Sequence, residues 1–320
     1  MGGSEGVTRA AKTYFTIRIW SAPLALGNYV VLGWLIGQAR ARLALGTQIT
    51  INLINMAATA LLVLVFDFGI AGAAIAAVTA ETSGLALGGL IAHRLSHGQL
   101  AVSRATLFDR AKLMRMLSVN RDIMIRTASL IAALLFFTAQ GARAGDMTLA
   151  ANAVLNNFLL ISAFLLDGLA NAAEQLCGRA SGARDREGFA GAVKLVVIWG
   201  FGFSFAVAAC FLLFGPALID MMTASADVRR IARDYLPFVI FAPLLGVFAF
   251  AYDGVYIGAT WARDMRNLML LSLAIFLAAW FALRSFGNAG LWGALLVHYA
   301  ARGGLEALRY PALLRKSFAS

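Results

Sequence analysis

Five amide and carboxylate side chains share one face of a long apolar segment, residues 147–176. They are Asn152, Asn156, Asp167, Asn171 and Glu174. At 100° per residue they fall within roughly 100° of one another around a helix. An ionisable group at a bilayer centre is unfavourable by about 2.5–3.5 kcal/mol, so this face must be shielded from lipid. It predicts either a substrate or proton path, or a structural network paired with Asn120, Arg126 or another helix.

A further carboxylate, Asp253, lies within the apolar segment 235–259, with Tyr252, Tyr256 and Thr260 close by. A carboxylate in a low-dielectric cavity takes up a proton more readily than one in water and can release it later in a cycle. It also attracts a cation, for which tyrosine faces add cation–π affinity. The alternative is a hydrogen bond between helices.

Two pairs of opposite charge are spaced four residues apart, which predicts salt bridges along a helix: Asp122 with Arg126, and Arg302 with Glu306. His298 lies one turn before Arg302. It could relay protons, although a lone histidine among apolar residues is more often a structural donor. Glu81, in the segment 70–92, is a weaker polar candidate.

The composition excludes a soluble enzyme. The chain has 320 residues, of which 61% are hydrophobic and 13% charged, against about 45–50% and 25% in soluble domains. Its mean hydropathy is +0.78. The sequence has no HExxH, Walker-type or GxSxG motif, and its two cysteines, Cys177 and Cys210, are interpreted as packing residues. We therefore expect no enzyme activity, no metal site and no cofactor.

Nine segments are long and apolar enough to cross a bilayer as helices, which predicts an all-α, polytopic membrane helical bundle. The segments are 13–37, 43–66, 70–92, 123–140, 147–176, 190–219, 235–259, 266–283 and 289–308.

The net charge of +11 is explained by membrane topology. Sixteen Lys and Arg side chains fall in the connections and the C-terminal segment on one side of the predicted membrane, and seven fall in the connections and the N-terminal tail on the other. The positive-inside rule therefore predicts a cytoplasmic C-terminus and a cytoplasmic connection after the third helix, with no need for a nucleic-acid partner. Within this connection, residues 101–118 predict an interfacial helix on the inner leaflet, the alternative being a solvated linker.

An internal repeat relates the two ends of the chain. Residues 33–37 and 254–258 both read Gly-x-x-x-Gly, at an offset of 221, and residues 68–73 resemble residues 286–291, at an offset of 218. A lone Gly-x-x-x-Gly usually means only helix packing, but two matches at nearly equal offsets favour a repeat.

The repeat implies a protein of two six-helix lobes from which three helices are missing at the start. We predict a partial N-lobe over 1–98, a cytoplasmic interfacial linker over 99–118 and a complete C-lobe over 119–320.

Several short stretches resemble the MATE family of multidrug and toxic compound extrusion transporters, and within it the branch named after DNA-damage-inducible protein F. The resemblance covers the chain from about residue 13 and is strong over 119–267. The stretches are Asn120-Arg121-Asp122, Arg126-Thr127, Thr138 to Arg143, Ala150 to Leu155, Asp167-Gly168, Ala172-Ala173-Glu174, Gly178 to Asp185 and Asp253 to Asn267.

The resemblance implies twelve helices in two lobes, of which this chain resembles helices four to twelve. It implies a monomer in the inner membrane that exchanges protons or sodium ions for a small-molecule organic cation or amphipathic drug, with an acidic residue at the position of Asp253 as a candidate coupling site. The alternative is a non-transporting membrane fragment of such a transporter.

The chain also departs from the family pattern. Proton-coupled members commonly carry an acidic residue four positions after an Asn in the helix that corresponds to 43–66, but here Asn55 is followed by Thr59. The first helix of the family, which carries another coupling carboxylate, has no counterpart. Coupling would therefore depend on Asp167, Glu174 and Asp253.

Overall fold

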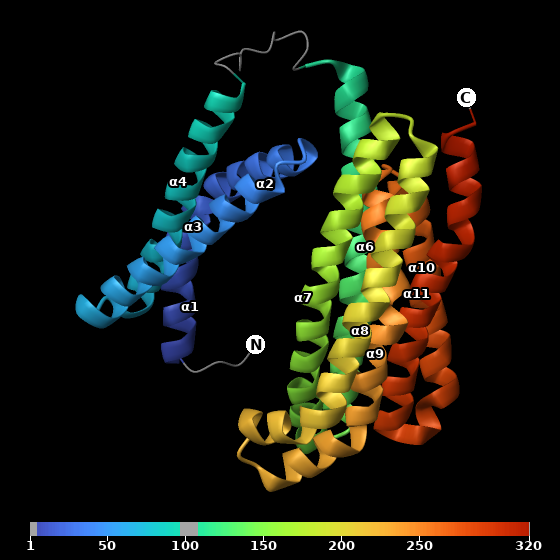
Figure 1. Ribbon diagram of the computed structural model, residues 1–320. Helices are drawn as coiled ribbons and strands as arrows, with labels where there is room; N and C mark the ends of the chain where they lie inside the picture. Colours follow the sequence, from blue (N-terminus) through green and yellow to red (C-terminus); the bar gives the residue numbers. More distant parts are fainter. Residues whose placement is uncertain (1–4, 97–107, 320) are drawn as a thin grey trace. The chain divides into compact units, whose positions relative to one another are not determined.

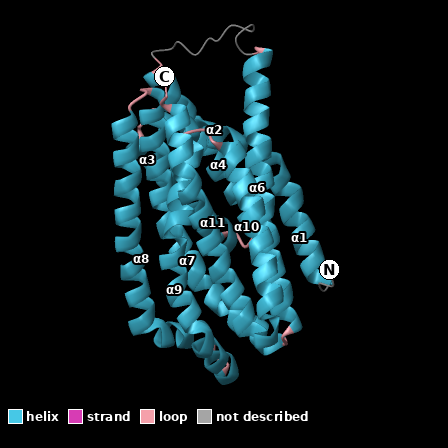
Figure 2. Ribbon diagram, turned by 90° about the vertical axis from the view of Figure 1, so that its right-hand side faces the viewer, coloured by secondary structure: helices cyan, strands magenta, loops and turns pink. Residues whose placement is uncertain are grey.

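The computed structural model describes residues 5–96 and 108–319. The chain forms two compact units, Met1–Phe108 and Asp109–Ser320. All regular elements in the described ranges are helical (Figure 2). Eight segments of this described part are long and apolar enough to cross a membrane, and the last of them, Ala262–Ser317, contains two successive helices. The predicted all-α membrane bundle is therefore confirmed.

The first unit contains α1 to α4, and an ion pair connects its first and last helices. Its elements are α1 (Glu5–Arg18), a 3-10 turn η1 (Ile19–Ser21), α2 (Ala22–Gly37), α3 (Ala41–Thr59), a π-helical segment η2 (Ala60–Val65) and α4 (Gly69–Leu95). The single span predicted over 13–37 is broken at η1, because Pro23 lacks an N–H and fits the first turn of a new helix. Arg18 Nη2 lies 2.6 Å from Glu81 Oε1.

The second unit is a six-helix bundle (Figure 1). Its helices are α6 (Arg110–Arg143), α7 (Asp146–Gly182), α8 (Arg186–Met222), α9 (Ala226–Gly258), α10 (Ala262–Leu283) and α11 (Gly287–Ser317), with a 3-10 turn η3 (Arg284–Phe286) between the last two.

The start of α6 differs from the sequence-based expectation of a separate interfacial helix over 101–118. Residues 101–107 lie outside the described residues, and residues 110–118 continue without a break into the membrane-spanning part of α6. No glycine or proline interrupts residues 110–140, so nothing in the sequence ends the helix there. The Asp109 side chain caps α6 by accepting a hydrogen bond of 2.9 Å from the Ala111 N–H.

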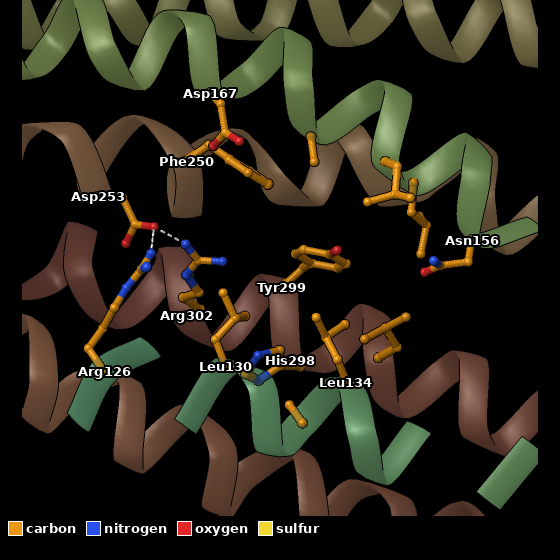
Figure 3. A pocket seen from close by; sticks show the side chains of 15 residues that line it. Arg126, Leu130, Leu134, Asn156, Asp167, Phe250, Asp253, His298, Tyr299 and Arg302 are labelled. Atoms are coloured by element: carbon orange, nitrogen blue, oxygen red, sulfur yellow. Dashed lines mark hydrogen bonds and ion pairs between the residues drawn. The ribbon is translucent and has the colours of Figure 1, made fainter. Parts of the chain in front are cut away.

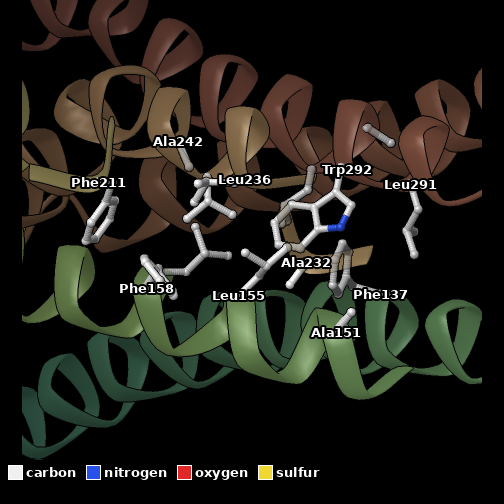
Figure 4. Packing of buried hydrophobic residues seen from close by; sticks show 14 of the residues in the cluster. Phe137, Ala151, Leu155, Phe158, Phe211, Ala232, Leu236, Ala242, Leu291 and Trp292 are labelled. Atoms are coloured by element: carbon white, nitrogen blue, oxygen red, sulfur yellow. The ribbon is translucent and has the colours of Figure 1, made fainter. Parts of the chain in front are cut away.

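The core of the bundle is built from aromatic and aliphatic side chains of α6, α7, α8, α9, α10 and α11, several of which are shown in Figure 4. Phe137 meets Trp292 edge to face at 4.9 Å between ring centroids, and Phe158 meets Phe211 in the same way at 4.9 Å. Such pairs contribute about 0.5–1.5 kcal/mol beyond their buried area. The core therefore packs α7 and α11 into the bundle, and these helices carry most of the polar residues discussed below.

Close packing of α7 on α9 depends on the second Gly-x-x-x-Gly motif. A Cβ at Gly254 would overlap the backbone carbonyl of Ala170, and a Cβ at Gly258 would approach the backbone carbonyl of Glu174 to 2.5 Å. A Cβ at Gly33 or Gly37 would meet nothing within 4 Å among the described residues. The packing interpretation of the motif therefore holds for residues 254–258, where small residues let two helix backbones approach.

Candidate functional site

A buried carboxylate, Asp253 on α9, forms ion pairs with two arginines from other helices. Its Oδ2 atom accepts hydrogen bonds from Nη2 of Arg126 on α6 and from Nη2 of Arg302 on α11 (Figure 3). Asp253 is 6% exposed and Arg302 is 3% exposed. The Arg302 guanidinium also lies 5.4 Å from the ring centroid of Phe250. In a low-dielectric interior such a cluster is stable only while its charges remain paired.

This cluster forms one end of a cavity of about 310 Å³ between α6, α7, α9 and α11. Asp167, on α7, lines the cavity at the charged end, whereas Asn156 on the same helix lies toward the opposite end (Figure 3). Most of the remaining wall is apolar, with leucine and alanine side chains and the rings of Phe250 and Tyr299. The cavity therefore combines an apolar wall with a small number of charged groups, as small-molecule sites do.

The predicted polar face of α7 is divided in the structure. Asn156 and Asp167 line the cavity, but Asn152 is buried in a network of its own. Asn171 is exposed and Glu174 is half-buried, and neither lines this cavity. The structure thus brings two of the five side chains to the site of Asp253.

Asn152 joins α7 to α11 through three hydrogen bonds. Its Nδ2 donates to Asn288 Oδ1 at 2.8 Å, while its Oδ1 accepts from Asn288 Nδ2 at 3.0 Å and from Trp292 Nε1 at 2.9 Å. All three side chains are buried. For Asn152, the structure therefore agrees with the second of the two interpretations of the polar face, a structural network paired with another helix.

Replacing Asn152 by alanine is expected to destabilise the protein by about 2 kcal/mol, because it leaves the buried donors of Trp292 and Asn288 without their acceptor. Thermal unfolding in detergent micelles measures this. Asn157→Ala is the matched control, since Asn157 is exposed and its amide bonds only to the backbone of its own helix. Equal stability losses in both variants would show that the network contributes nothing.

Both salt bridges predicted at a spacing of four residues are wrong. Asp122 pairs with Arg266 of α10 at 2.6 Å and with the adjacent Arg121 at 3.1 Å, whereas Arg126 pairs with Asp253. Arg302 also pairs with Asp253 and not with Glu306. The reason is that long arginine side chains in a packed bundle reach carboxylates on neighbouring helices as easily as those one turn away.

His298 and Tyr256 are both buried and both hydrogen-bonded to backbone. His298 Nδ1 lies 3.2 Å from the Ser272 carbonyl oxygen, which places the proton on Nδ1, and its ring lines the cavity. The Tyr256 hydroxyl donates to the Glu306 carbonyl oxygen at 2.8 Å, away from the cavity lining. Thr260 lies beyond the end of α9, in the turn to α10.

Sequence reasoning missed that Arg302 is a partner of Asp253, and that Phe250 and Tyr299 line the cavity. Arg302 is 49 residues from Asp253, so no helical spacing connects them. One available signal was the presence of two arginines and several carboxylates in segments too apolar to leave them unpaired.

Comparison with protein families gives a match to the MatE model over residues 114–282, which is more than half of the chain. The chain is 35% identical to DNA damage-inducible protein F of Escherichia coli K12, over 95% of this chain and 66% of that protein. It is 24% identical to the chloroplastic Protein DETOXIFICATION 44 of Arabidopsis thaliana, over 91% and 55%. The chain thus spans slightly less than two thirds of the first relative and about half of the second.

Solved structures show the same fold. The chain is similar to a crystal structure of the Vibrio cholerae MATE transporter VcmN, with a TM-score of 0.90 and 20% identity, over all of this chain and 73% of that one. It is also similar to a MOP superfamily transporter from Pyrococcus furiosus, with a TM-score of 0.82 and 19% identity, over 99% and 72%.

Proposed function

The chain belongs to the MATE family of membrane transporters, and on this premise we propose that it is a secondary antiporter, or the larger part of one, that exports organic cations or other amphipathic xenobiotics. The exchanged ion is a proton or a sodium ion. The protein is a multi-pass membrane protein; we place it in the cell inner membrane as a monomer, with its C-terminus in the cytoplasm and no cofactor.

The observation that carries this proposal is the cavity of about 310 Å³ with charged groups at one end. Its apolar wall suits the hydrocarbon part of an amphipathic molecule. Asp167 makes no ion pair within the described part of the chain, so its carboxylate is available to a cationic group. The faces of Phe250 and Tyr299 would add cation–π attraction.

Asp253 is the coupling residue of this proposal. A proton on its carboxylate removes the negative charge that pairs with Arg126 and Arg302, and this breaks the ionic contacts of α6 and α11 with α9. Asp253 and Asp167 line the same cavity, so the proton and the cationic substrate would bind within one site, as an exchange mechanism requires.

The test is dye efflux driven by a pH gradient, measured for Asp253→Asn and Asp167→Asn. We expect Asp253→Asn to abolish efflux and Asp167→Asn to reduce it for cationic dyes. Asp227→Asn is the matched control, because Asp227 lies in the first turn of the same helix as Asp253 and is exposed to solvent.

Unchanged efflux in both cavity variants would contradict the assignment of the site. No efflux by the unsubstituted, folded chain would favour the second candidate function, a non-transporting membrane fragment. That candidate is motivated by the chain's span of 66% and 55% of its relatives.

A further inference from the structure

A second buried carboxylate, Glu306, lies on α11 one turn after Arg302. Its side chain is 1% exposed, and neither of its carboxylate oxygens has a hydrogen-bond partner among the described residues. Only its backbone carbonyl is used, as the acceptor for the Tyr256 hydroxyl at 2.8 Å. Glu306 is absent from the lining of the cavity, whereas Asp253 contributes to it.

An ionised carboxylate in this position would be unfavourable, because a charge taken out of water without hydrogen bonds or a partner keeps its full desolvation penalty. A protonated Glu306 avoids that penalty. The two arginines then face two other carboxylates: Asp253, with which both pair, and Asp167, which lines the same cavity. The remaining charges of the cluster balance.

The groups that face Glu306 come from three helices. They are Asp253, Tyr252 and Tyr256 of α9, Arg302 of α11 and Arg126 of α6. Arg302 precedes Glu306 by four residues on the same helix, a spacing at which the two side chains can meet without any movement of the backbone. The Arg302 Nε atom also has no partner among the described residues, so a donor is free for a second carboxylate.

We infer that Glu306 is a proton-binding residue that alternates with Asp253, and this inference rests on the proposed antiport. While Arg302 pairs with Asp253, Glu306 carries the proton. When the proton passes from the Glu306 carboxyl to the Asp253 carboxylate, Asp253 becomes neutral, Glu306 becomes negative and Arg302 turns to Glu306. One O–H bond breaks and one forms, and the proton reaches the residue that lines the cavity.

The test is infrared spectroscopy of the purified 320-residue chain in lipid vesicles. The unsubstituted protein should show the carbonyl stretch of a protonated, buried carboxylic acid. Glu306→Gln should remove this band, and the matched control Glu187→Gln, at the exposed start of α8, should retain it. Glu306→Asp should retain a band at a shifted frequency, so that the assignment does not depend on the folding of one variant.

The second part of the infrared experiment uses the variant Asp253→Asn. With Asp253 neutral, Arg302 should pair with Glu306, and the Glu306 band should disappear although Glu306 is still present. A band that persists in Glu306→Gln, or one that is unchanged in Asp253→Asn, would overturn the inference.

The two proposals can fail separately. The infrared experiment requires no transport, so a chain that shows the Glu306 band but no efflux would contradict the proposed function and leave the proton site standing. In a chain that transports, Glu306→Gln should lose efflux driven by a pH gradient and retain exchange of labelled for unlabelled dye. Retention of gradient-driven efflux would exclude a role for Glu306 in coupling.

Discussion

Replacing Asp253 by asparagine is expected to lower the free energy of unfolding by about 3 kcal/mol, because it leaves the buried Arg302 and the half-buried Arg126 without their shared anion. The loss lies at the low end for a broken buried ion pair, since Glu306 is one turn from Arg302 and can become its partner. Denaturation of the purified protein in detergent micelles measures it. Asp167→Asn is the control within the cavity and should change stability by less than about 1 kcal/mol.

A double-mutant cycle separates the contributions of the two buried carboxylates. Glu306→Gln alone should be nearly neutral, within about 1 kcal/mol, because glutamine resembles a protonated glutamate in shape and charge. The double variant D253N/E306Q should lose about 5 kcal/mol, since Arg302 then has no carboxylate at all. The loss of stability in the double variant should therefore exceed the sum of the losses in the two single variants, as expected for residues in one network. Additive losses would show that Arg302 does not turn to Glu306.

Gly254→Ala is the second substitution with a large expected effect, again about 3 kcal/mol or more. The added Cβ would overlap the Ala170 carbonyl, which is backbone and cannot move aside as a side chain can. Helices α7 and α9 would have to separate at the position next to Asp253. A gain of up to about 1 kcal/mol from the better helix propensity of alanine offsets only part of this.

Gly246→Ala is the matched control on the same helix. Its Cβ would meet the Phe250 ring at 3.5 Å, an ordinary van der Waals contact, so stability should be unchanged or slightly improved. Thermal unfolding of the two alanine variants side by side measures the difference. If both variants unfold at the same temperature, the close approach of α7 and α9 is not required for stability.

Helix positions and membrane class were predictable because both are local properties. Apolar runs long enough to cross a bilayer must be helical, since only a helix satisfies its own backbone in lipid. The break in the helix at Ile19–Ser21 was not predicted, although its cause, Pro23, is visible in the sequence. Hydropathy averages over a whole segment and is insensitive to three residues that change helix type.

That the polar residues of α7 share one face of the helix was predictable from the sequence. The contacts that each of them makes were not. Helical periodicity places Asn152 and Asp167 within about 60° of each other. The structure assigns Asn152 to a network with Asn288 and Trp292, and Asp167 to the cavity. The two residues lie four turns apart along the helix, and at each level a different part of α11 faces α7, which a projection down the helix axis does not show.

The sequence by itself determined that this is an all-α membrane protein with carboxylates buried in its helices, because hydropathy and periodicity act over one helix at a time. The tertiary structure alone decided the pairing of those charges. Arg126 and Asp253 are 127 residues apart, and their meeting depends on how α6 packs beside α9. Whether Arg302 pairs with Asp253 or with Glu306 likewise depends on the distance between α9 and α11. Side-chain packing sets this distance, and residue spacing within one helix does not determine it.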